Sequence, residues 1–357
     1  MFELDKLLRP NIRNLSPYSS ARDEFKGEAS VYLDANENSY GSPLKLRYNR
    51  YPDPMQMKVK EKLSKIKGIP AASIFLGNGS DEAIDLLFRA FCRPGKDQVL
   101  LPSPTYGMYQ VSANINDIEI KIVSLLPDFQ LNLDAIAQAI VPLSVSPDSC
   151  TKLIFLCSPN NPTGNSFFRE DIEVILNNFE GIVVIDEAYI NFSKQRSFIS
   201  DLADYPNLVV LQTLSKAWGL AGLRLGMAFA SEQIIRILSK VKAPYNVNQA
   251  SQQLALEALE NLNQVNEWIK EIVNQRELLV AELKRFARIE KIYPSDANFL
   301  LVKMKDPEMV YRHLVEGGII VRNRSKVDLC EGCLRITIGT KSENEKLITV
   351  LKELSHG

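Results

Sequence analysis

The sequence predicts an α/β fold, in which a largely parallel sheet is flanked by helices and followed by a smaller α+β region. Short apolar runs alternate with amphipathic stretches as far as Thr213: "SIFLG", "QVLLP", "TKLIFLC", "GIVVIDEA" and "NLVVLQT". Most of these runs are apolar on both faces, as is typical of strands buried inside a parallel sheet. The stretches between them, such as Asp81–Cys92 and Arg169–Phe179, have the periodicity of helices that cover such a sheet.

The pattern changes from Asn248 onward. A polar and amphipathic helical stretch continues to about Ala287 and is followed by the strand-like runs "NFLLVKM", "GIIVRN" and "LRITIG". We therefore expect an N-terminal arm over residues 1–27, a large domain over 28–246 and a small α+β domain over 247–357. The arm is too short to form a hydrophobic core of its own.

Composition excludes several classes of function. Lys and Arg total 42 and Asp and Glu total 43, so net charge offers no attraction to nucleic acid or to an anionic membrane. No run of about 18 apolar residues predicts a membrane span, and the first residues lack the apolar core of a signal peptide. We expect a cytoplasmic protein that acts on small molecules.

The cysteines and histidines do not predict a metal site. Cys330 and Cys333 form a CxxC pair, but a zinc site needs a second pair of ligands, and the chain has only His313 and His356. We expect no metal, and instead a buried or half-exposed thiol pair before a strand. Because histidine is scarce, a lysine with a lowered pKa is a candidate for acid–base chemistry.

Candidate site residues follow the predicted strands, where open α/β sheets bind ligands. After the first strand, Ser80 and Asp81 begin a helix whose free N–H groups could bind an anion, although a capped turn would look the same. Tyr106 follows the second strand and could stack on a flat ligand or simply pack. The third strand leads into the rigid loop "SPNNPTGN", which presents Asn160 and Asn161.

Two further strand ends carry charged residues. Asp186 ends a strongly apolar strand, where a carboxylate is costly unless it meets a cation or caps a helix. Tyr189 comes three residues later. After the next strand, Lys216 lies in a glycine-rich apolar stretch with Thr213, Ser215 and Arg224.

Together these residues fit one ligand, pyridoxal 5′-phosphate. Its phosphate would meet the helix start, the two hydroxyls and Arg224, and its ring would be covered by Tyr106. Its ring nitrogen would pair with Asp186, its phenolic oxygen would be reached by Asn161 and Tyr189, and its aldehyde would react with Lys216.

The motifs "SPNNPTG", "DEAY" and "SKAWGLAGLRLG" resemble, in order and spacing, those of the fold-type I aminotransferases that depend on pyridoxal phosphate. The resemblance implies a large domain with a mixed, mostly parallel sheet. It also implies roles for individual residues: Lys216 forms the Schiff base and moves protons, Asp186 binds the ring nitrogen, and Tyr189 and Asn161 contact the ring oxygen. Tyr106 stacks on the ring, and the phosphate is held by Ser80, Asp81, Thr213, Ser215 and Arg224.

Within that family, "NLSPYSSARDE", "LDANENSYGSP", "RYPDP", "VRNRS" and "CLRITIGT" are similar to motifs of the histidinol-phosphate aminotransferases. This implies transfer of the amino group from L-histidinol phosphate to 2-oxoglutarate in histidine biosynthesis. It also implies a homodimer in which Tyr51 reaches the cofactor phosphate of the partner subunit. Substrate anions would be bound by Tyr18, Asn161, Arg322 and Arg335.

Three other functions remain open at this stage. A broad aromatic aminotransferase, or a decarboxylase of a phosphorylated amino acid, would use the same cofactor and cavity. A regulator that binds the cofactor without catalysis is the third. The near-zero net charge and the lack of a DNA-binding extension do not favour this third function.

Overall fold

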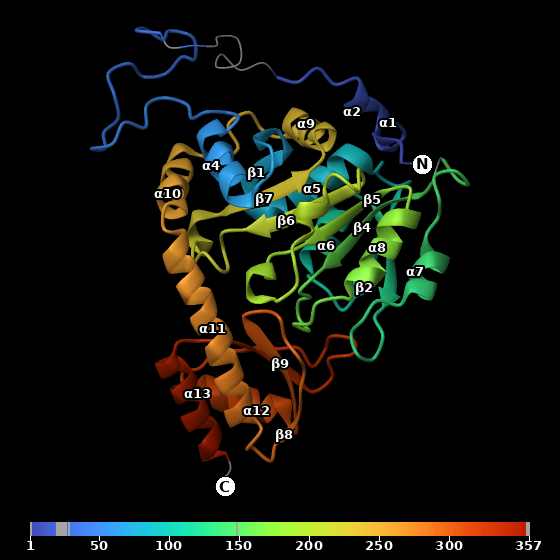
Figure 1. Cartoon of the computed structure of the whole chain (residues 1–357), viewed down its shortest axis with the longest axis vertical. Coiled ribbons are helices and arrows are strands. Elements are labelled where there is room, and N and C mark those ends of the chain that lie inside the picture. Colours follow the sequence, from blue (N-terminus) through green and yellow to red (C-terminus); the bar gives the residue numbers. More distant parts are fainter. Residues whose placement is uncertain (1, 19–26, 28, 148, 355–357) are drawn as a thin grey trace.

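A computed structural model describes residues 2–18, 27, 29–147 and 149–354 (Figure 1). The chain forms two sheets, one at the centre of Figure 1 and a smaller one below it, and the long helix α11 (Leu262–Leu283) runs down towards the smaller sheet. Among the helices in the described part of the chain, none combines the length and apolar character needed to cross a bilayer.

The large sheet has seven strands in the order β1-β7-β6-β5-β4-β2-β3. Only β7 runs antiparallel to its neighbours, so the predicted mixed, mostly parallel sheet is confirmed. The strands are β1 (Ile74–Asn78), β2 (Gln98–Ser103), β3 (Glu119–Ser124), β4 (Thr151–Cys157), β5 (Ile182–Asp186), β6 (Leu208–Thr213) and β7 (Leu225–Ala230).

Helices cover both faces of the large sheet because its strands are apolar on both. Successive residues of β5 illustrate this: Val183 and Ile185 pack into one buried cluster, and Ile182 and Val184 pack into the other. The helices are α4 (Met57–Lys67), α5 (Gly79–Phe91), α6 (Met108–Ile115), α7 (Leu133–Ala139), α8 (Arg169–Asn178) and α9 (Glu232–Val241). Short 3₁₀ turns are η1 (Ala71–Ser73), η2 (Ile190–Phe192), η3 (Phe198–Asp201) and η4 (Ala221–Leu223).

The small sheet has the order β10-β11-β9-β8, and all its pairings are antiparallel. The predicted strand over "GIIVRN" is reduced to its last two residues, because only these pair with β11. The helical stretch after Asn248 is likewise broken in two near Asn261. The elements are α10 (Gln249–Leu259), α11, β8 (Ile289–Ile292), β9 (Phe299–Met304), α12 (Pro307–Glu316), β10 (Arg322–Asn323), β11 (Cys333–Thr337) and α13 (Lys341–Glu353).

The N-terminal residues pack on the large sheet rather than on one another. Helices α1 (Leu4–Leu7) and α2 (Pro10–Arg13) are short, and Leu4 and Leu7 join the buried cluster that includes α5. Residues 29–50 form no helix or strand and extend away from the body of the molecule (Figure 1). This extended segment exposes several large apolar side chains: Val31, Leu33, Tyr40, Leu44 and Leu46.

Strand β7 and the start of helix α5 touch through their backbones. A Cβ atom on Gly226 would lie 2.1 Å from the backbone nitrogen of Ser80, so no side chain fits there. The turn before β7 is held in the same place: Arg224 adopts a left-handed conformation (φ 55°), and its carbonyl accepts a 2.9 Å hydrogen bond from the N–H of Gly79.

We therefore expect Gly226→Ala to lower the free energy of unfolding by about 1–3 kcal/mol or more, because β7 and α5 must separate to admit the methyl group. Thermal unfolding of the variant and the wild type measures the effect. Gly222→Ala is the matched control, since its new Cβ would meet no atom within 4 Å. Equal midpoints for the two variants would contradict the packing described here.

Candidate active site

The predicted cofactor residues converge on one cavity at the carboxyl ends of the large-sheet strands. Each of them except Tyr51 lines it. Three residues that sequence reasoning did not select, Gly79, Cys157 and Ala188, line it as well. The complete lining is Gly79, Ser80, Asp81, Tyr106, Cys157, Asn161, Asp186, Ala188, Tyr189, Thr213, Ser215, Lys216 and Arg224.

One end of the cavity is a cup of hydrogen-bond donors, which we call the anion cup: the first turn of α5, Thr213, Ser215 and Arg224. The first N–H groups of an α-helix have no partner within the helix and carry a partial positive charge. The hydroxyls of Thr213 and Ser215 lie 3.0 Å apart, and the Arg224 guanidinium lies 3.4 Å from the carboxylate of Asp81. Such a set of donors is suited to a phosphate.

Asp186 provides a buried negative charge in the wall of the cavity. Its carboxylate accepts a 2.6 Å hydrogen bond from the hydroxyl of Tyr109 and a 3.0 Å bond from the N–H of Ala188. Burial raises the pKa of this carboxyl, and these two donors oppose the rise. No lysine or arginine of the described residues forms an ion pair with Asp186, so a cationic ligand group would relieve its desolvation.

Tyr109 is a site residue that sequence reasoning missed. It is fully buried, stacks on Phe155 with ring centres 4.8 Å apart, and donates its hydrogen bond to Asp186 from α6. The available signal was the spacing of the tyrosines in "YGMY": Tyr106 lies just before α6, Tyr109 lies in its first turn, and their rings meet. The partner of Tyr109 lies 77 residues away along the chain, and no local pattern indicates it.

Lys216 lines the same cavity. Its side chain is accessible to solvent, and its Nζ atom is 5.6 Å from the ring centre of Tyr189. Surrounding protein atoms lower the pKa of the amine, the positive charge of Arg335 lowers it further, and Asp186 opposes both effects. The amine therefore loses its proton more readily than a surface lysine does.

Tyr106 covers the cavity from the start of α6. Its hydroxyl donates a 3.2 Å hydrogen bond to Asp81, and its ring meets that of Tyr109 edge-on at 5.5 Å. Burial raises the pKa of Tyr106, and Asp81 adds to the effect, so the hydroxyl keeps its proton and acts as a donor. The tyrosine thereby orients the carboxylate that faces Arg224.

The small sheet reaches the cavity through Arg335. Its guanidinium donates a 2.5 Å hydrogen bond to the side-chain oxygen of Asn161, whose amide lies 3.4 Å from the hydroxyl of Tyr189. Arg335 also lies over the ring of Phe299, with 5.1 Å between the guanidinium carbon and the ring centre. The neighbouring Asn160 is buried and bonds to Pro104 and Thr163, so it holds the loop that presents Asn161.

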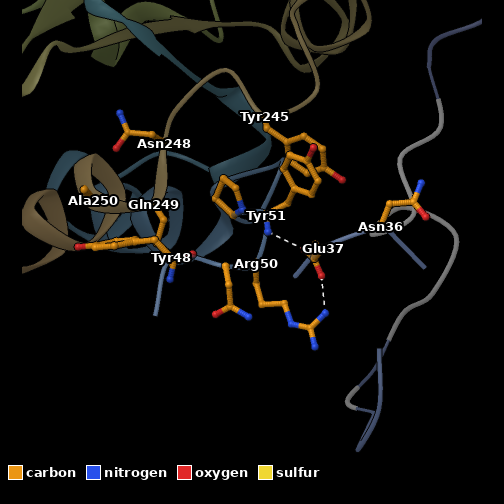
Figure 2. A pocket seen from close by; sticks show the side chains of 11 residues that line it. Asn36, Glu37, Tyr48, Arg50, Tyr51, Tyr245, Asn248, Gln249 and Ala250 are labelled. Carbon is orange, nitrogen blue, oxygen red and sulfur yellow. Dashed lines mark hydrogen bonds and ion pairs between the residues drawn. The ribbon is translucent and has the colours of Figure 1, made fainter. Parts of the chain in front are cut away.

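Tyr51 is not brought to this cavity within one chain. It lies in a second pocket, shown in Figure 2, where its ring stacks on Tyr245 at 4.4 Å. The carboxylate of Glu37 accepts hydrogen bonds from the backbone N–H of Tyr51 (2.6 Å) and from Arg50 (2.7 Å). Glu37 thereby fixes the backbone from which Tyr51 projects.

Tyr18 and Arg322 are also outside the cavity lining. Tyr18 is 73% exposed and lines neither of the two pockets. Arg322 is exposed and lies opposite Arg335 in the pairing of β10 with β11. Cys330 and Cys333 are buried and free, but only Cys330 precedes the strand, since Cys333 is the first residue of β11. The described residues contain no cluster of three or more potential metal ligands.

The cavity agrees in chemistry with the cofactor expected from the sequence. The anion cup suits a phosphate, the buried Asp186 suits a protonated ring nitrogen, and the accessible amine of Lys216 lines the same cavity. Gly226 keeps the cup open, because any side chain at that position would press on the first turn of α5. These residues are therefore able to hold pyridoxal phosphate.

Comparison with known proteins agrees with this arrangement. A model of the aminotransferase class I and II family matches residues 37–351. A histidinol-phosphate aminotransferase of Parabacteroides distasonis is 55% identical over 354 residues, which are 99% of each chain.

Two solved structures share the fold. The histidinol-phosphate aminotransferase of Clostridium acetobutylicum superposes with a TM-score of 0.78 at 21% identity, over 87% of this chain and 91% of that one. The enzyme of the same name from Sinorhizobium meliloti, in complex with pyridoxal-5′-phosphate, superposes with a TM-score of 0.75 at 22% identity, over 97% of both chains. The architecture predicted from the sequence is thus confirmed, and the chain belongs to the aminotransferase class I and II family.

Proposed function

We propose that this chain catalyses, with pyridoxal 5′-phosphate, the transfer of an amino group from L-histidinol phosphate to 2-oxoglutarate in histidine biosynthesis. The products are imidazole acetol phosphate and L-glutamate. The observation that carries the chemistry is the single cavity in which Lys216, Asp186 and the anion cup meet. The substrate is supported by the 55% identity to the Parabacteroides distasonis histidinol-phosphate aminotransferase.

In this proposal the anion cup holds the cofactor phosphate, and Tyr106 covers the ring. Asp186 faces the ring nitrogen, Asn161 and Tyr189 face the ring oxygen, and Lys216 attaches the cofactor covalently. When bound, the cofactor supplies an electron sink for the charge that develops at the substrate Cα. Asp186 favours the protonated ring nitrogen that this requires, and Tyr109 helps to keep its carboxylate ionised.

Lys216 acts as the base once its amine is free. Only an unprotonated amine accepts the proton from the substrate Cα, and burial and Arg335 lower the pKa of Lys216. Tyr18, Asn161, Arg322 and Arg335 are proposed to bind the anionic groups of the substrates. Arg335 supports this most directly, since its hydrogen bond to Asn161 brings its charge to the cavity.

We also propose a cytoplasmic homodimer in which Tyr51 completes the partner's site. A segment with apolar side chains as exposed as Leu33 (84%) and Leu46 (61%) is suited to contact with another chain. The predicted division into an arm (1–27), a large domain (28–246) and a small domain (247–357) stays a proposal. The small domain is supported by a separate buried cluster, which extends from Leu279 to Leu351.

The first test follows the visible absorption of the bound cofactor during titration with L-histidinol phosphate. We expect the wild-type band to convert to that of the amine form, and Lys216→Ala to slow the conversion about 10²- to 10⁴-fold or more, because the base is lost. Lys216→Arg is the matched control: it keeps a charge but cannot act as a base, so it is expected to fail equally.

Other outcomes of this titration point to the alternatives. Conversion by phenylalanine but not by histidinol phosphate would replace the proposal with a broad aromatic aminotransferase. Release of carbon dioxide from a phosphorylated amino acid would indicate a decarboxylase. A bound cofactor that responds to none of these amines would indicate a regulator that does not catalyse a reaction.

A second prediction concerns pH. Arg335→Met removes the positive charge that lowers the pKa of Lys216, so this pKa is expected to rise. The pH at which Lys216 of the cofactor-free protein reacts half-maximally with pyridoxal phosphate, trapped by borohydride, should then move upward. Arg312→Met, on the exposed face of α12, is the control and should leave the profile in place. An unmoved profile in Arg335→Met would show that Arg335 has no effect on this amine.

A third prediction uses mixed dimers of Tyr51→Phe and Lys216→Ala subunits. If Tyr51 acts on the partner's site, one site of each mixed dimer is wild type in both residues and should bind the cofactor with wild-type affinity. The Tyr51→Phe homodimer should bind it about tenfold more weakly, because a hydrogen bond to the phosphate is lost. The arrangement would be contradicted if the mixed dimer bound the cofactor as weakly as the Tyr51→Phe homodimer does. It would also be contradicted if the protein sedimented as a monomer and had full activity.

A further inference from the structure

Sequence reasoning and the cavity lining both left out a third arginine of the small sheet, Arg324. Its backbone N–H donates a 2.8 Å hydrogen bond to the carbonyl of Cys333, which continues the pairing of β10 with β11 by one residue. Arg322 is paired with Arg335 in the same ladder. In paired strands, opposite residues and residues two apart project from the same face. Arg322, Arg324 and Arg335 therefore share one face.

The residue between them confirms the alternation. The side chain of Asn323 turns to the opposite side, where its amide donates a 2.8 Å hydrogen bond to Glu308 of α12. Arg335 turns towards Asn161, at the cavity. The face that carries the three arginines is thus the one directed at the candidate active site.

The arginines of this face have hydrogen-bonding capacity that the described protein groups do not use. The Nε atoms of Arg324 and Arg335 are buried and have no hydrogen-bond partner among the described residues. A buried donor without a partner is costly, and more so when it is charged. Two such donors on one face of the sheet indicate a ligand that accepts several hydrogen bonds.

Among the described residues, no carboxylate forms an ion pair with any of these three arginines. Burial lowers the pKa of Arg324, and the neighbouring Arg322 lowers it further, while the opposing influences are Cys330 and Tyr189. The pKa of Arg335 is lowered by burial, is raised by Tyr189 and is lowered by the two other arginines. Tyr189, which opposes the lowering of both pKa values, lines the cavity.

We propose that Arg324 is a specificity-determining residue that binds the phosphate of a phosphorylated amine substrate, together with Arg322 and Arg335. A carboxylate carries one charge, and the fork of one arginine satisfies its two oxygens. A phosphate ester carries about −1.5 to −2 charges and three acceptor oxygens, which matches several guanidiniums with unused donors. The identity of the amine, L-histidinol phosphate, rests on the proposed function.

The proposal separates the two substrates of the reaction. L-Glutamate and 2-oxoglutarate carry only carboxylates, so Arg335 with its partner Asn161 is sufficient for one of these groups. Removal of Arg324 should therefore weaken the binding of the phosphorylated substrate and leave the binding of the dicarboxylates almost unaffected. Removal of a residue with a purely structural role would weaken the binding of both alike.

Calorimetry measures the binding of inorganic phosphate to the holoenzyme, in which the cofactor occupies the anion cup, and steady-state kinetics give the KM for L-histidinol phosphate. We expect Arg324→Gln to raise the dissociation constant of phosphate and this KM about ten- to a hundredfold. The KM of the variant for L-glutamate should change less than about threefold. Lys326→Gln is the matched control, because it removes the same charge from an exposed position two residues along, and it should change none of these constants appreciably.

Arg324→Lys tests whether the effect of Arg324→Gln comes from poor folding. It keeps the charge but lacks the forked guanidinium, so its affinity for phosphate should lie between those of the wild type and Arg324→Gln. Unchanged phosphate binding in Arg324→Gln, or equal weakening of phosphate and glutamate, would overturn the inference. The inorganic phosphate titration does not depend on the amine. If Arg324→Gln binds inorganic phosphate more weakly but the wild type does not convert L-histidinol phosphate, the inference is supported and the proposed function is wrong.

Discussion

The burial of the Asp186 carboxylate is the constraint on which the arrangement of the site depends. The parallel strand β5 delivers this residue to the inside of the molecule, and desolvation raises its pKa. Two donors, the Tyr109 hydroxyl and the Ala188 N–H, stabilise the charge without neutralising it. A carboxylate held in this way interacts strongly with a cation placed beside it, because little water screens the pair. The stacking of Tyr109 on Phe155 therefore does two things: it fills the core, and it positions the hydroxyl that stabilises the charge of Asp186.

The reversed strand β7 supplies the other half of the site. It runs against its neighbours, so the chain that leaves β6 with Thr213 returns through Arg224 to the start of α5. Gly226 allows the two backbones to touch, and the left-handed Arg224 turns its carbonyl to Gly79. The donors of the anion cup come from distant parts of the sequence, and the backbone contact between β7 and the start of α5 holds them together. This rigidity is what an anion site made of fixed backbone dipoles requires.

The sequence predicted the elements and residues whose signals are local. Strands apolar on both faces, the rigid loop around Asn161, the carboxylate at a strand end and the lysine in a glycine-rich stretch are all readable in a short window. Tyr109 and Arg324 were missed because their roles depend on partners distant in sequence or on strand pairing. The length of β10 was overestimated, because the apolar residues before Arg322 do not pair with a neighbouring strand. Strand β7 was missed because the glycine-rich stretch that precedes it indicated a binding site rather than a strand.

The anion cup and the proposed phosphate site differ in how their charge is balanced. Arg224 of the anion cup already faces Asp81, and most of the remaining donors are backbone N–H groups and hydroxyls, which suits an anion that stays bound. Among the described residues, no carboxylate forms an ion pair with Arg322, Arg324 or Arg335, and Arg335 bonds to the neutral Asn161. An uncompensated set attracts an anion from solution and raises the local concentration of anionic substrates. Burial lowers the pKa of Lys216, Arg335 lowers it further, and Asp186 opposes both effects. In the proposed function, Arg335 therefore has two effects: it attracts an anionic substrate, and it favours the unprotonated amine of Lys216.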